Sequence, residues 1–467
     1  MSDSSNAYSL LKQLWNDGLP HFKSFIEIPN ITPGFETDQS NALKTLALIK
    51  SYMNFINLIP SKVTTVHDKD LSPFLLIEFE GNTEITTGFY CHADKQPPLT
   101  EKWDDGLDPY KLIEVADKLY GRGTVDDGYA IFLTLNLIKT IKEKQEKVDN
   151  FIILIETSEE SGSCHLAHYL DKFEKTLAHM NYLFVVDSGG PTYDRLWFTT
   201  SFRGCFMGEL NIKVAEKTQH SGEVGGVISQ PFHIASNIIS DVVDSVNGKA
   251  TTIDSKMGVK YNQLDIKKAK SFVDEMGEKS IVYESIDTIK AHVPISLETY
   301  LSKVLYTNVS IIGMNGLPSV AQGGNMIIPE ITLKLSIRAS PYHTDITKVI
   351  KFVTQYFKEK NTYGAMVTFN AGLHCDGWKA DNFSEKMETK LDKISFSHFG
   401  NKAGYVGAGG SIPIMGLLKK KLPSCKIFAT GVLTPDAGAH GPNEFLHIPT
   451  LHKFSRCFYD MIISLED

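Results

Sequence analysis

Apolar residues recur every three or four positions in several parts of the chain, which is the spacing of an amphipathic helix. This pattern predicts helices at residues 8–26 and 41–56 and a closing helix at 449–465. Other apolar residues form short runs, which predict buried strands. The clearest runs are PFLLIEFE at 73–80, GFYC at 88–91, FIILIE at 151–156 and YLFVVD at 182–187.

Helical patterns separate the later of these runs. Residues 129–144 and 165–177 carry helical spacing and lie between consecutive predicted strands. Buried strands that alternate with helices are typical of a mostly parallel sheet with helices on both faces. The predicted fold class is therefore α/β.

The pattern changes near Arg203. The segments FRGCFMGELNIKVAE and ITLKLSIRAS alternate polar and apolar residues with period two, and helical segments lie between and after them. A strand-like segment at 425–432 then resumes the first pattern. We therefore predict one domain formed by residues 1–205 and 377–467, interrupted by a smaller α+β domain at 206–376.

The composition and net charge exclude several classes of protein. The 467 residues are 42% hydrophobic and 22% charged, as in globular proteins, and 47 Lys+Arg against 55 Asp+Glu gives a net charge of −8. The chain therefore has no excess of basic residues with which to neutralise the phosphates of a nucleic acid. No apolar run approaches the roughly 18 residues that are needed to cross a bilayer. The polar, acidic beginning of the chain does not resemble an export signal. We expect a soluble, cytoplasmic protein without nucleic-acid or membrane partners.

The six cysteines are scattered and contain no CxxC pair. They therefore predict neither a disulfide framework nor a thiolate zinc site, which fits a reducing cytoplasm.

Acidic and histidine residues stand where the predicted strands end or in a glycine-rich turn, LYGRGTVDDG. They are His92, Asp94, Glu159, Glu160, Asp187 and, in the turn, Asp126. The carboxyl ends of parallel strands open onto one crevice, so we expect these side chains to converge.

Several converging carboxylates repel one another unless a cation keeps them ionised. Imidazole together with carboxylate suits zinc, with cobalt or manganese as alternatives, and the absence of thiolates favours a catalytic site. An aspartate can bridge two ions about 3.5–4 Å apart with one water between them. The sequence therefore predicts a centre for divalent metal.

Seven segments from about residue 90 onward carry recognisable motifs: HADKQPPL, KLYGRGTVDD, ETSEESGS, RGCFMGELNIKVAEKTQHSGEVGG, LSIR, GGSIP and GAHGPNE. In this order they resemble one family, the dinuclear zinc metallopeptidases that include aminoacylase, glutamate carboxypeptidase and succinyl-diaminopimelate desuccinylase. The resemblance is strongest to the carnosinase-like cytosolic dipeptidases. The resemblance implies a zinc-peptidase-like catalytic domain with an inserted lid that forms a homodimer.

The resemblance also implies a ligand set. His92 and Asp187 would hold one zinc ion, Glu160 and His440 the other, and Asp126 would bridge the two. Asp94 would orient the imidazole of His92. Glu159 would act as general base, taking a proton from a metal-bridged water and delivering it to the leaving amine.

Further residues are implied to bind the substrate. His220 would stabilise the oxyanion in the site of the neighbouring subunit. Arg338 would clamp the terminal carboxylate of the substrate with its bidentate guanidinium, helped by the backbone around Gly410 and by Ser411.

Two positions depart from the family pattern. Asp126 is followed by Asp127, Gly128 and Tyr129, where the family has Lys-Gly, and Met326 stands where the carnosinase pattern has threonine. The first departure bears on local contacts and substrate range rather than on metal binding.

Three functions remain open. The predicted activity is hydrolysis of dipeptides or short peptides with a free C-terminus. The runner-up is an N-acyl-amino-acid deacylase, which would use the same metals and the same carboxylate clamp. A catalytically silent peptide-binding relative is a third possibility, although the complete set of ligands and base disfavours it.

Overall fold

The computed structural model describes residues 2–36, 38–244, 248–281, 295–360, 363–434 and 436–465. These residues form two compact units. The first comprises the described residues of Met1–Thr200, Ala380–Val406 and Leu417–Asp467, and the second those of Ser201–Lys379 and Gly407–Gly416. The predicted bounds placed Gly407–Gly416 in the first domain, together with the residues on either side.

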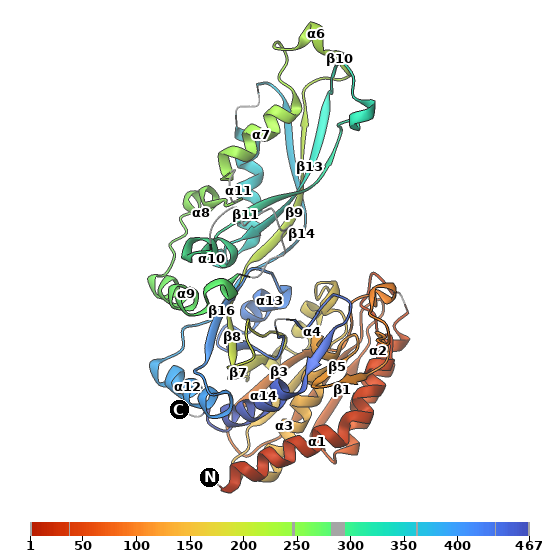
Figure 1. Ribbon diagram of the computed structural model, residues 1–467, viewed down its shortest axis with the longest axis vertical. Coiled ribbons are helices and arrows are strands. Elements are labelled where there is room, and N and C mark those ends of the chain that lie inside the picture. Colours follow the sequence, from red (N-terminus) through yellow and green to blue (C-terminus); the bar gives the residue numbers. More distant parts are fainter. Residues whose placement is uncertain are drawn as a thin grey trace. The chain divides into compact units, whose positions relative to one another are not determined.

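The first unit is built on a mixed sheet (Figure 1). Seven of its nine strands, in spatial order, are β1 (Lys62–Val66), β2 (Phe74–Phe79), β6 (Asn150–Glu156), β3 (Thr86–His92), β7 (Tyr182–Val185), β17 (Lys426–Thr430) and β8 (Trp197–Phe202). The other two, β15 (Trp378–Lys379) and β16 (Gly404–Ala408), both pair with β8. The four strands β6, β3, β7 and β17 are parallel neighbours, whereas β1, β2 and β8 pair antiparallel. The predicted α/β class with parallel central strands is confirmed.

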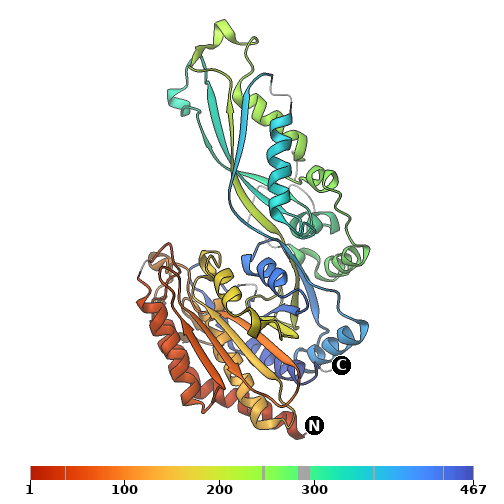
Figure 2. The same cartoon turned by 180° about the vertical axis from the view of Figure 1, so that it is seen from behind.

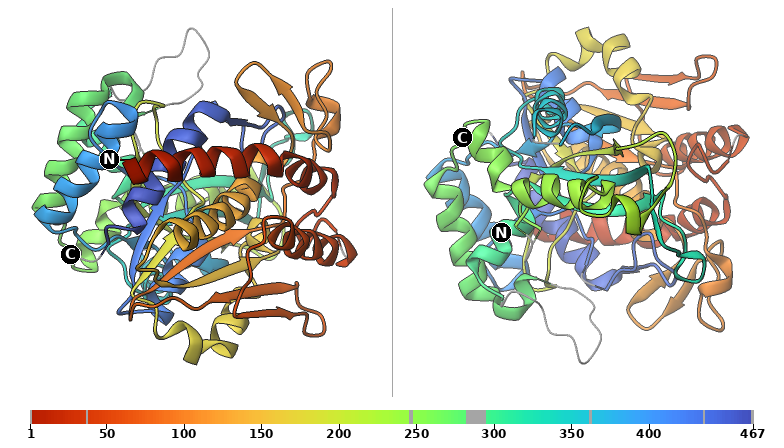
Figure 3. Two further views of the ribbon diagram at one scale, coloured as in Figure 1. Left: turned by 90° about the horizontal axis from the view of Figure 1, so that it is seen from below. Right: turned by 90° about the horizontal axis from the view of Figure 1, so that it is seen from above.

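Helices bury both faces of this sheet, which is why its central strands are continuous apolar runs. Helices α1 (Ser2–Glu27) and α3 (Tyr129–Lys144) lie side by side on one face (Figure 3). The ring centres of Phe22 and Phe132, one from each helix, are 5.3 Å apart. Helix α14 (Ile448–Ile462) joins the same core. On the other face, Tyr169 of α4 (Leu166–Lys172) stacks on Phe74.

A small antiparallel sheet connects two loops of the first unit. Strand β5 (Lys118–Tyr120) pairs on one side with β4 (Ile113–Val115) and on the other with β18 (Phe445–His447). The loop after β5 and the loop before β18 are therefore adjacent. The first unit also contains α2 (Ser40–Phe55), α5 (Glu174–Leu177) and α12 (Glu385–Phe399). β16 (Gly404–Ala408) and α13 (Pro413–Lys421) each have residues in both units.

The second unit contains an antiparallel sheet with strand order β11 (Asn308–Asn315), β13 (Glu330–Ala339), β9 (Gly204–Lys213) and β14 (Met366–Cys375). Strands β9 and β13 alternate buried and partly exposed residues, as their period-two pattern predicts. Helix α11 (Ile346–Glu359), teal in Figure 2, packs its buried Val349, Val353 and Phe357 against this sheet.

Helix α7 (Pro231–Val242) belongs to the same core as α11. The second unit contains further helices and strands. They are β10 (Gln219–His220), α6 (Ser221–Val224), α8 (Thr251–Lys256), α9 (Gln263–Met276), α10 (Leu297–Val304), β12 (Met326–Ile327) and β15 (Trp378–Lys379).

Most predicted elements are found within a few residues of their expected bounds. The expected helix at 165–177 is the main exception, because it is divided at Phe173 into α4 and α5. Among the described residues, no helix combines the length and apolarity that a membrane span requires.

Candidate active site

The strand-end residues of the first unit converge as expected. His92 is the last residue of β3, Glu159 and Glu160 lie in a 3-10 turn directly after β6, and Asp187 follows β7 by two residues. Because β6, β3 and β7 are parallel neighbours, these ends meet at one edge of the sheet.

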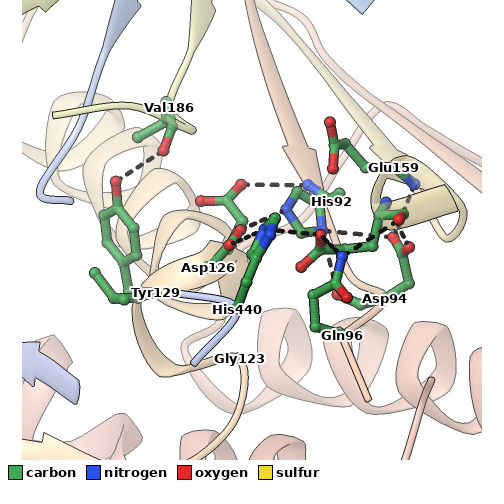
Figure 4. Close-up of polar contacts among 12 residues, drawn as sticks. His92, Asp94, Gln96, Gly123, Asp126, Tyr129, Glu159, Val186 and His440 are labelled. Carbon is green, nitrogen blue, oxygen red and sulfur yellow. Dashed lines mark hydrogen bonds and ion pairs between the residues drawn. The ribbon is translucent and has the colours of Figure 1, made fainter. Parts of the chain in front are cut away.

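Asp126 joins the two histidines of the cluster (Figure 4). Its Oδ1 lies 3.0 Å from Nε2 of His92, and its Oδ2 lies 3.0 Å from Nε2 of His440. The same nitrogen of His440 is 3.0 Å from Oε2 of Glu160. His440 reaches this position from a backbone with a φ of 62°, a conformation that non-glycine residues rarely adopt.

Two groups of side chains are close enough to share an ion. Ligand atoms of His92, Glu159 and Asp187 all lie within 4.8 Å of one another, and so do those of His92, Asp126 and Glu160. His92 and Asp187 are at most 6% exposed, whereas the side chain of His440 is 60% exposed and leaves the cluster open to solvent on one side.

Burial and mutual repulsion act on the carboxylates of the cluster. Burial, followed by the charge of Asp126, raises the pKa of Asp187 well above its usual range. Burial and the charge of Asp187 do the same for the pKa of Glu159. Burial also acts on Asp126, but hydrogen bonds with His440 and His92 outweigh it and lower the pKa of this carboxyl. The cluster therefore holds more negative charge than its two histidines neutralise.

The donor atoms fit a divalent metal. Two imidazole nitrogens and several carboxylate oxygens face one another, and no thiol is among them, which is the donor set of catalytic zinc, manganese or cobalt sites. A cation at this position would supply the positive charge that the buried carboxylates lack.

Asp94 contacts both the histidine and the glutamates. Its Oδ1 lies 3.4 Å from Nδ1 of His92, as expected for a residue that orients the imidazole. Its two oxygens also accept hydrogen bonds from the backbone N–H groups of Glu159 and Glu160, at 3.1 and 3.0 Å. One carboxylate thus contacts the imidazole of His92 and the backbone of both glutamates.

Glu444 is an important residue to which sequence reasoning gave no role. Its buried carboxylate accepts backbone hydrogen bonds from Gly123, Val125 and Asp126 at 3.0–3.2 Å. It also accepts a 2.8 Å hydrogen bond from buried Arg122, whose other terminal nitrogen donates to the carbonyl of Gly441. Glu444 and Arg122 therefore tie the loop of Asp126 to the loop of His440.

Glu444→Gln is expected to lower the free energy of unfolding by about 3–5 kcal/mol, because it leaves the buried guanidinium of Arg122 without its counter-charge. Urea denaturation measures this change. Glu143→Gln, which alters a surface pair with Lys139, is the matched control and should stay within about 0.5 kcal/mol of wild type. Equal stability of the two variants would contradict the assigned role.

The absence of the family's lysine at position 128 has a steric explanation. At Gly128, a Cβ would lie 2.4 Å from the carbonyl oxygen of Gly123 and 2.5 Å from the ring of Phe25, so a lysine does not fit this backbone. A different lysine is buried nearby: Lys95 donates to carbonyl oxygens at the end of α1, those of Phe25, Ile26 and Ile28.

Tyr129 stands where the family has glycine, and it supports the cluster from another side. Its hydroxyl donates a 2.7 Å hydrogen bond to the carbonyl of Val186, next to Asp187, and accepts one from the backbone of Val432. Gln96 similarly holds Glu160, with Nε2 2.7 Å from Oε2. Sequence reasoning assigned neither residue.

The substrate-binding residues expected from the resemblance lie in the second unit. Arg338 at the end of β13 donates a 2.8 Å hydrogen bond to the hydroxyl of Ser411. The carbonyl of Gly410 accepts from the backbone of Arg203, whose side chain donates to Gly409. Burial and the charge of Arg338 lower the pKa of Arg203 to about 10. Two guanidinium groups thus give this part of the second unit a local positive charge.

His220 lies at the end of β10, where it pairs with Met326 of β12. Its Nδ1 accepts a 3.1 Å hydrogen bond from the backbone of Gly222, and its side chain is exposed. Met326, at the second departure from the family pattern, is therefore the cross-strand neighbour of His220.

Known proteins resemble this chain in sequence and structure. It is 25% identical to human Beta-Ala-His dipeptidase over 417 residues, covering 86% of this chain and 79% of the human protein. It is 27% identical to the Cys-Gly metallodipeptidase DUG1 of Saccharomyces cerevisiae over 409 residues, covering 81% and 79%.

Solved structures share the fold. The dipeptidase Dug1p from S. cerevisiae superposes with a TM-score of 0.73 at 21% identity, covering 98% of both chains. The metallo-carboxypeptidase Sso-CP2 from Sulfolobus solfataricus gives the same TM-score at 18% identity, covering 95% of this chain and 98% of its own.

The family-level comparison covers most of the chain. Residues 88–464 match peptidase family M20/M25/M40, a span that contains every residue assigned to the site above. The expected family and the expected activity of a metal-dependent peptidase are thereby confirmed. The chain belongs to peptidase family M20/M25/M40.

Proposed function

We propose that this protein hydrolyses the amide bond of dipeptides or short peptides that have a free C-terminal carboxylate. The observation that carries the proposal is the convergence of two histidines and four carboxylates at one edge of the first unit's sheet. The relatives add support, because their names describe dipeptidases for β-Ala-His and Cys-Gly. Cytoplasmic location remains part of the proposal.

Two divalent ions, most consistent with zinc and with manganese or cobalt as alternatives, are proposed to occupy the cluster. His92 and Asp187 would hold one, Glu160 and His440 the other, and Asp126 would contribute an oxygen to each. The position of Asp126 between the two histidines supports this assignment. When bound, such ions polarise a carbonyl and make water more acidic.

Glu159 is the proposed general base. Its carboxylate would accept a proton from the attacking water and then deliver it to the nitrogen of the leaving amine. Burial and the neighbouring charge of Asp187 raise the pKa of Glu159, which makes it a better proton acceptor than an exposed glutamate. Asp94 fixes the backbone of Glu159 and so limits the positions the base can take.

Arg338 is the proposed clamp for the C-terminal carboxylate, with Ser411 and Gly410 completing the pocket. The hydrogen bond from Arg338 to Ser411 orients the guanidinium, and Arg203 adds positive charge. A guanidinium offers two parallel donors to a carboxylate, which a point charge does not.

Arg338→Met is expected to raise KM for a dipeptide by about 10–100-fold, because a charge-assisted hydrogen bond of about 1.5–3 kcal/mol is lost. The same dipeptide with a C-terminal amide serves as the control, since it lacks the carboxylate. Steady-state rates on both substrates measure the effect. A similar loss on both substrates would count against the clamp.

A homodimer through the second unit is also proposed, with His220 acting in the partner's site. In support, the edge strand β11 carries exposed apolar side chains, with Ile311 55%, Ile312 50% and Met314 47% exposed. Clustered apolar exposure of this kind is typical of protein interfaces.

Mixing Glu159→Gln chains with His220→Ala chains is expected to restore part of the activity that each variant alone lacks. In a mixed dimer, one site would combine an intact Glu159 with an intact His220. Activity after subunit exchange, verified with differently tagged chains, measures complementation. Proven exchange without any gain in activity would exclude a role for His220 across subunits.

The direct test of substrate class compares dipeptides with N-acetyl amino acids that share the same C-terminal residue. Rates are measured with the zinc-, manganese- and cobalt-loaded protein. The proposal predicts higher kcat/KM on the dipeptides. Preference for the N-acetyl compounds would establish the deacylase alternative instead.

A further inference from the structure

Two cysteines far apart in the sequence stand opposite each other in the second unit. Cys205 of β9 and Cys375 of β14 are direct partners in the antiparallel pairing of these strands. On its other side, Cys205 is paired with Arg338 of β13. Arg338, Cys205 and Cys375 therefore form a row across three adjacent strands.

This row lies on the face of the sheet away from the hydrophobic core. Phe206 and Ile337, the neighbours of Cys205 and Arg338 along their strands, are fully buried in that core. Successive side chains of a strand point to opposite faces, so Cys205 and Arg338 point away from it. Cys205 and Cys375 are both partly exposed residues.

The pairing geometry matches what a disulfide requires. Directly opposed residues of antiparallel strands have Cα atoms about 4.5–5.5 Å apart. Disulfides span Cα separations of about 4.4–6.8 Å, so a bridge between these two positions needs no change of register. Accessible cross-strand disulfides are also readily reduced, which makes them suitable for reversible chemistry.

We propose that Cys205 and Cys375 form a redox-active dithiol that hydrogen peroxide or a related peroxide converts to an intramolecular disulfide beside Arg338. The Cys205 thiolate attacks one peroxide oxygen, the O–O bond breaks, and a sulfenic acid and one water result. The Cys375 sulfur then displaces the sulfenic oxygen, which leaves as a second water. The two thiols lose two electrons and two protons in total, and the peroxide is reduced to water.

The surroundings of the two thiols indicate that Cys205 reacts first and Cys375 second. Burial and the nearby Cys205 raise the pKa of Cys375 to about 11, even though the charge of Arg338 acts in the opposite direction. A thiol reacts with peroxide through its thiolate, so Cys375 is a poor first nucleophile. It serves as the second, resolving thiol.

The expected consequence concerns the substrate pocket and rests on the proposed role of Arg338. A bridge that ties β9 to β14 forms directly beside Arg338, which holds Ser411 through its 2.8 Å hydrogen bond. The oxidised protein is therefore expected to bind the substrate carboxylate less well, with KM raised several-fold and kcat little changed.

The experiment treats the metal-loaded full-length protein with hydrogen peroxide and maps its disulfides by mass spectrometry without reduction. Trypsin releases Cys205 in peptide 204–213 and Cys375 in peptide 361–379. We expect these two peptides to be linked, with the link removed by a phosphine reductant. Cys205→Ser and Cys375→Ser should each abolish the link, whereas Cys164→Ser, which removes an exposed thiol, should preserve it.

Absence of the linked peptides, while Cys164 in the same sample is oxidised, would overturn the proposal. This readout does not depend on catalysis, so it separates the failure of the dithiol from the failure of the peptidase assignment. A complete link without any change in KM for dipeptides would overturn the coupling to Arg338. A rise in KM that reductant reverses, and that Cys205→Ser lacks, supports it.

Discussion

Glu159→Gln is expected to reduce kcat for peptide hydrolysis by about 10²–10⁴-fold, the usual contribution of a general base, while the bound metal stays the same. Glutamine keeps the size of the side chain and the backbone hydrogen bond to Asp94, but its amide cannot accept the proton of the attacking water. Rates on a dipeptide and metal content by elemental analysis, measured on one preparation, test both parts.

The metal measurement distinguishes two roles for this residue. A ligand atom of Glu159 lies within 4.8 Å of those of His92 and Asp187, so Glu159 is also close enough to bind an ion itself. If it were a ligand, the glutamine variant would lose metal together with activity. Glu143→Gln, on the surface, is the control and should change neither quantity. Full activity of the Glu159→Gln variant would show that Glu159 takes no part in the reaction.

Asp126→Asn is expected to have the second large effect, lowering both metal affinity and activity by well over about 100-fold. Loss of a supporting residue around a metal typically costs about 10–100-fold, and Asp126 is assigned as a direct ligand to both ions. Its two oxygens contact His92 and His440 separately, each at 3.0 Å. Asparagine has one oxygen and no charge, so it cannot offer a charged oxygen to each of two ions.

Competition with a zinc-binding dye measures the affinity of this variant. Asp108→Asn, at the surface next to Lys111, is the matched control and should bind zinc as wild type does. An Asp126→Asn protein that retains wild-type affinity and activity would show that no ion depends on this carboxylate.

The sequence pattern predicted those parts of the site that depend on strand ends. His92, Glu159 and Asp187 follow apolar runs, and the geometry of parallel strands brings such positions together whatever their separation in sequence. His440 was found only through its motif, because it comes from a loop whose position depends on the pairing of Phe445 with Tyr120.

The contacts that support the site could not be predicted in the same way. Glu444 binds backbone N–H groups of a loop more than 300 residues earlier in the chain, and no spacing rule signals such a contact. The pairing of Cys205 with Cys375 depends on the register of two strands, which shifts by an irregularity between Ala371 and His374. The period-two pattern identified β9, but the sequence pattern predicted neither β14 nor this shift.

The central claim is that the histidine and carboxylate cluster holds two divalent ions in each chain. Elemental analysis of the wild-type protein, reconstituted with zinc and freed of unbound metal by gel filtration, tests this claim most directly. The account predicts close to two zinc ions per chain, and fewer in Asp126→Asn. A wild-type protein that retains no zinc, manganese or cobalt after the same treatment would contradict it.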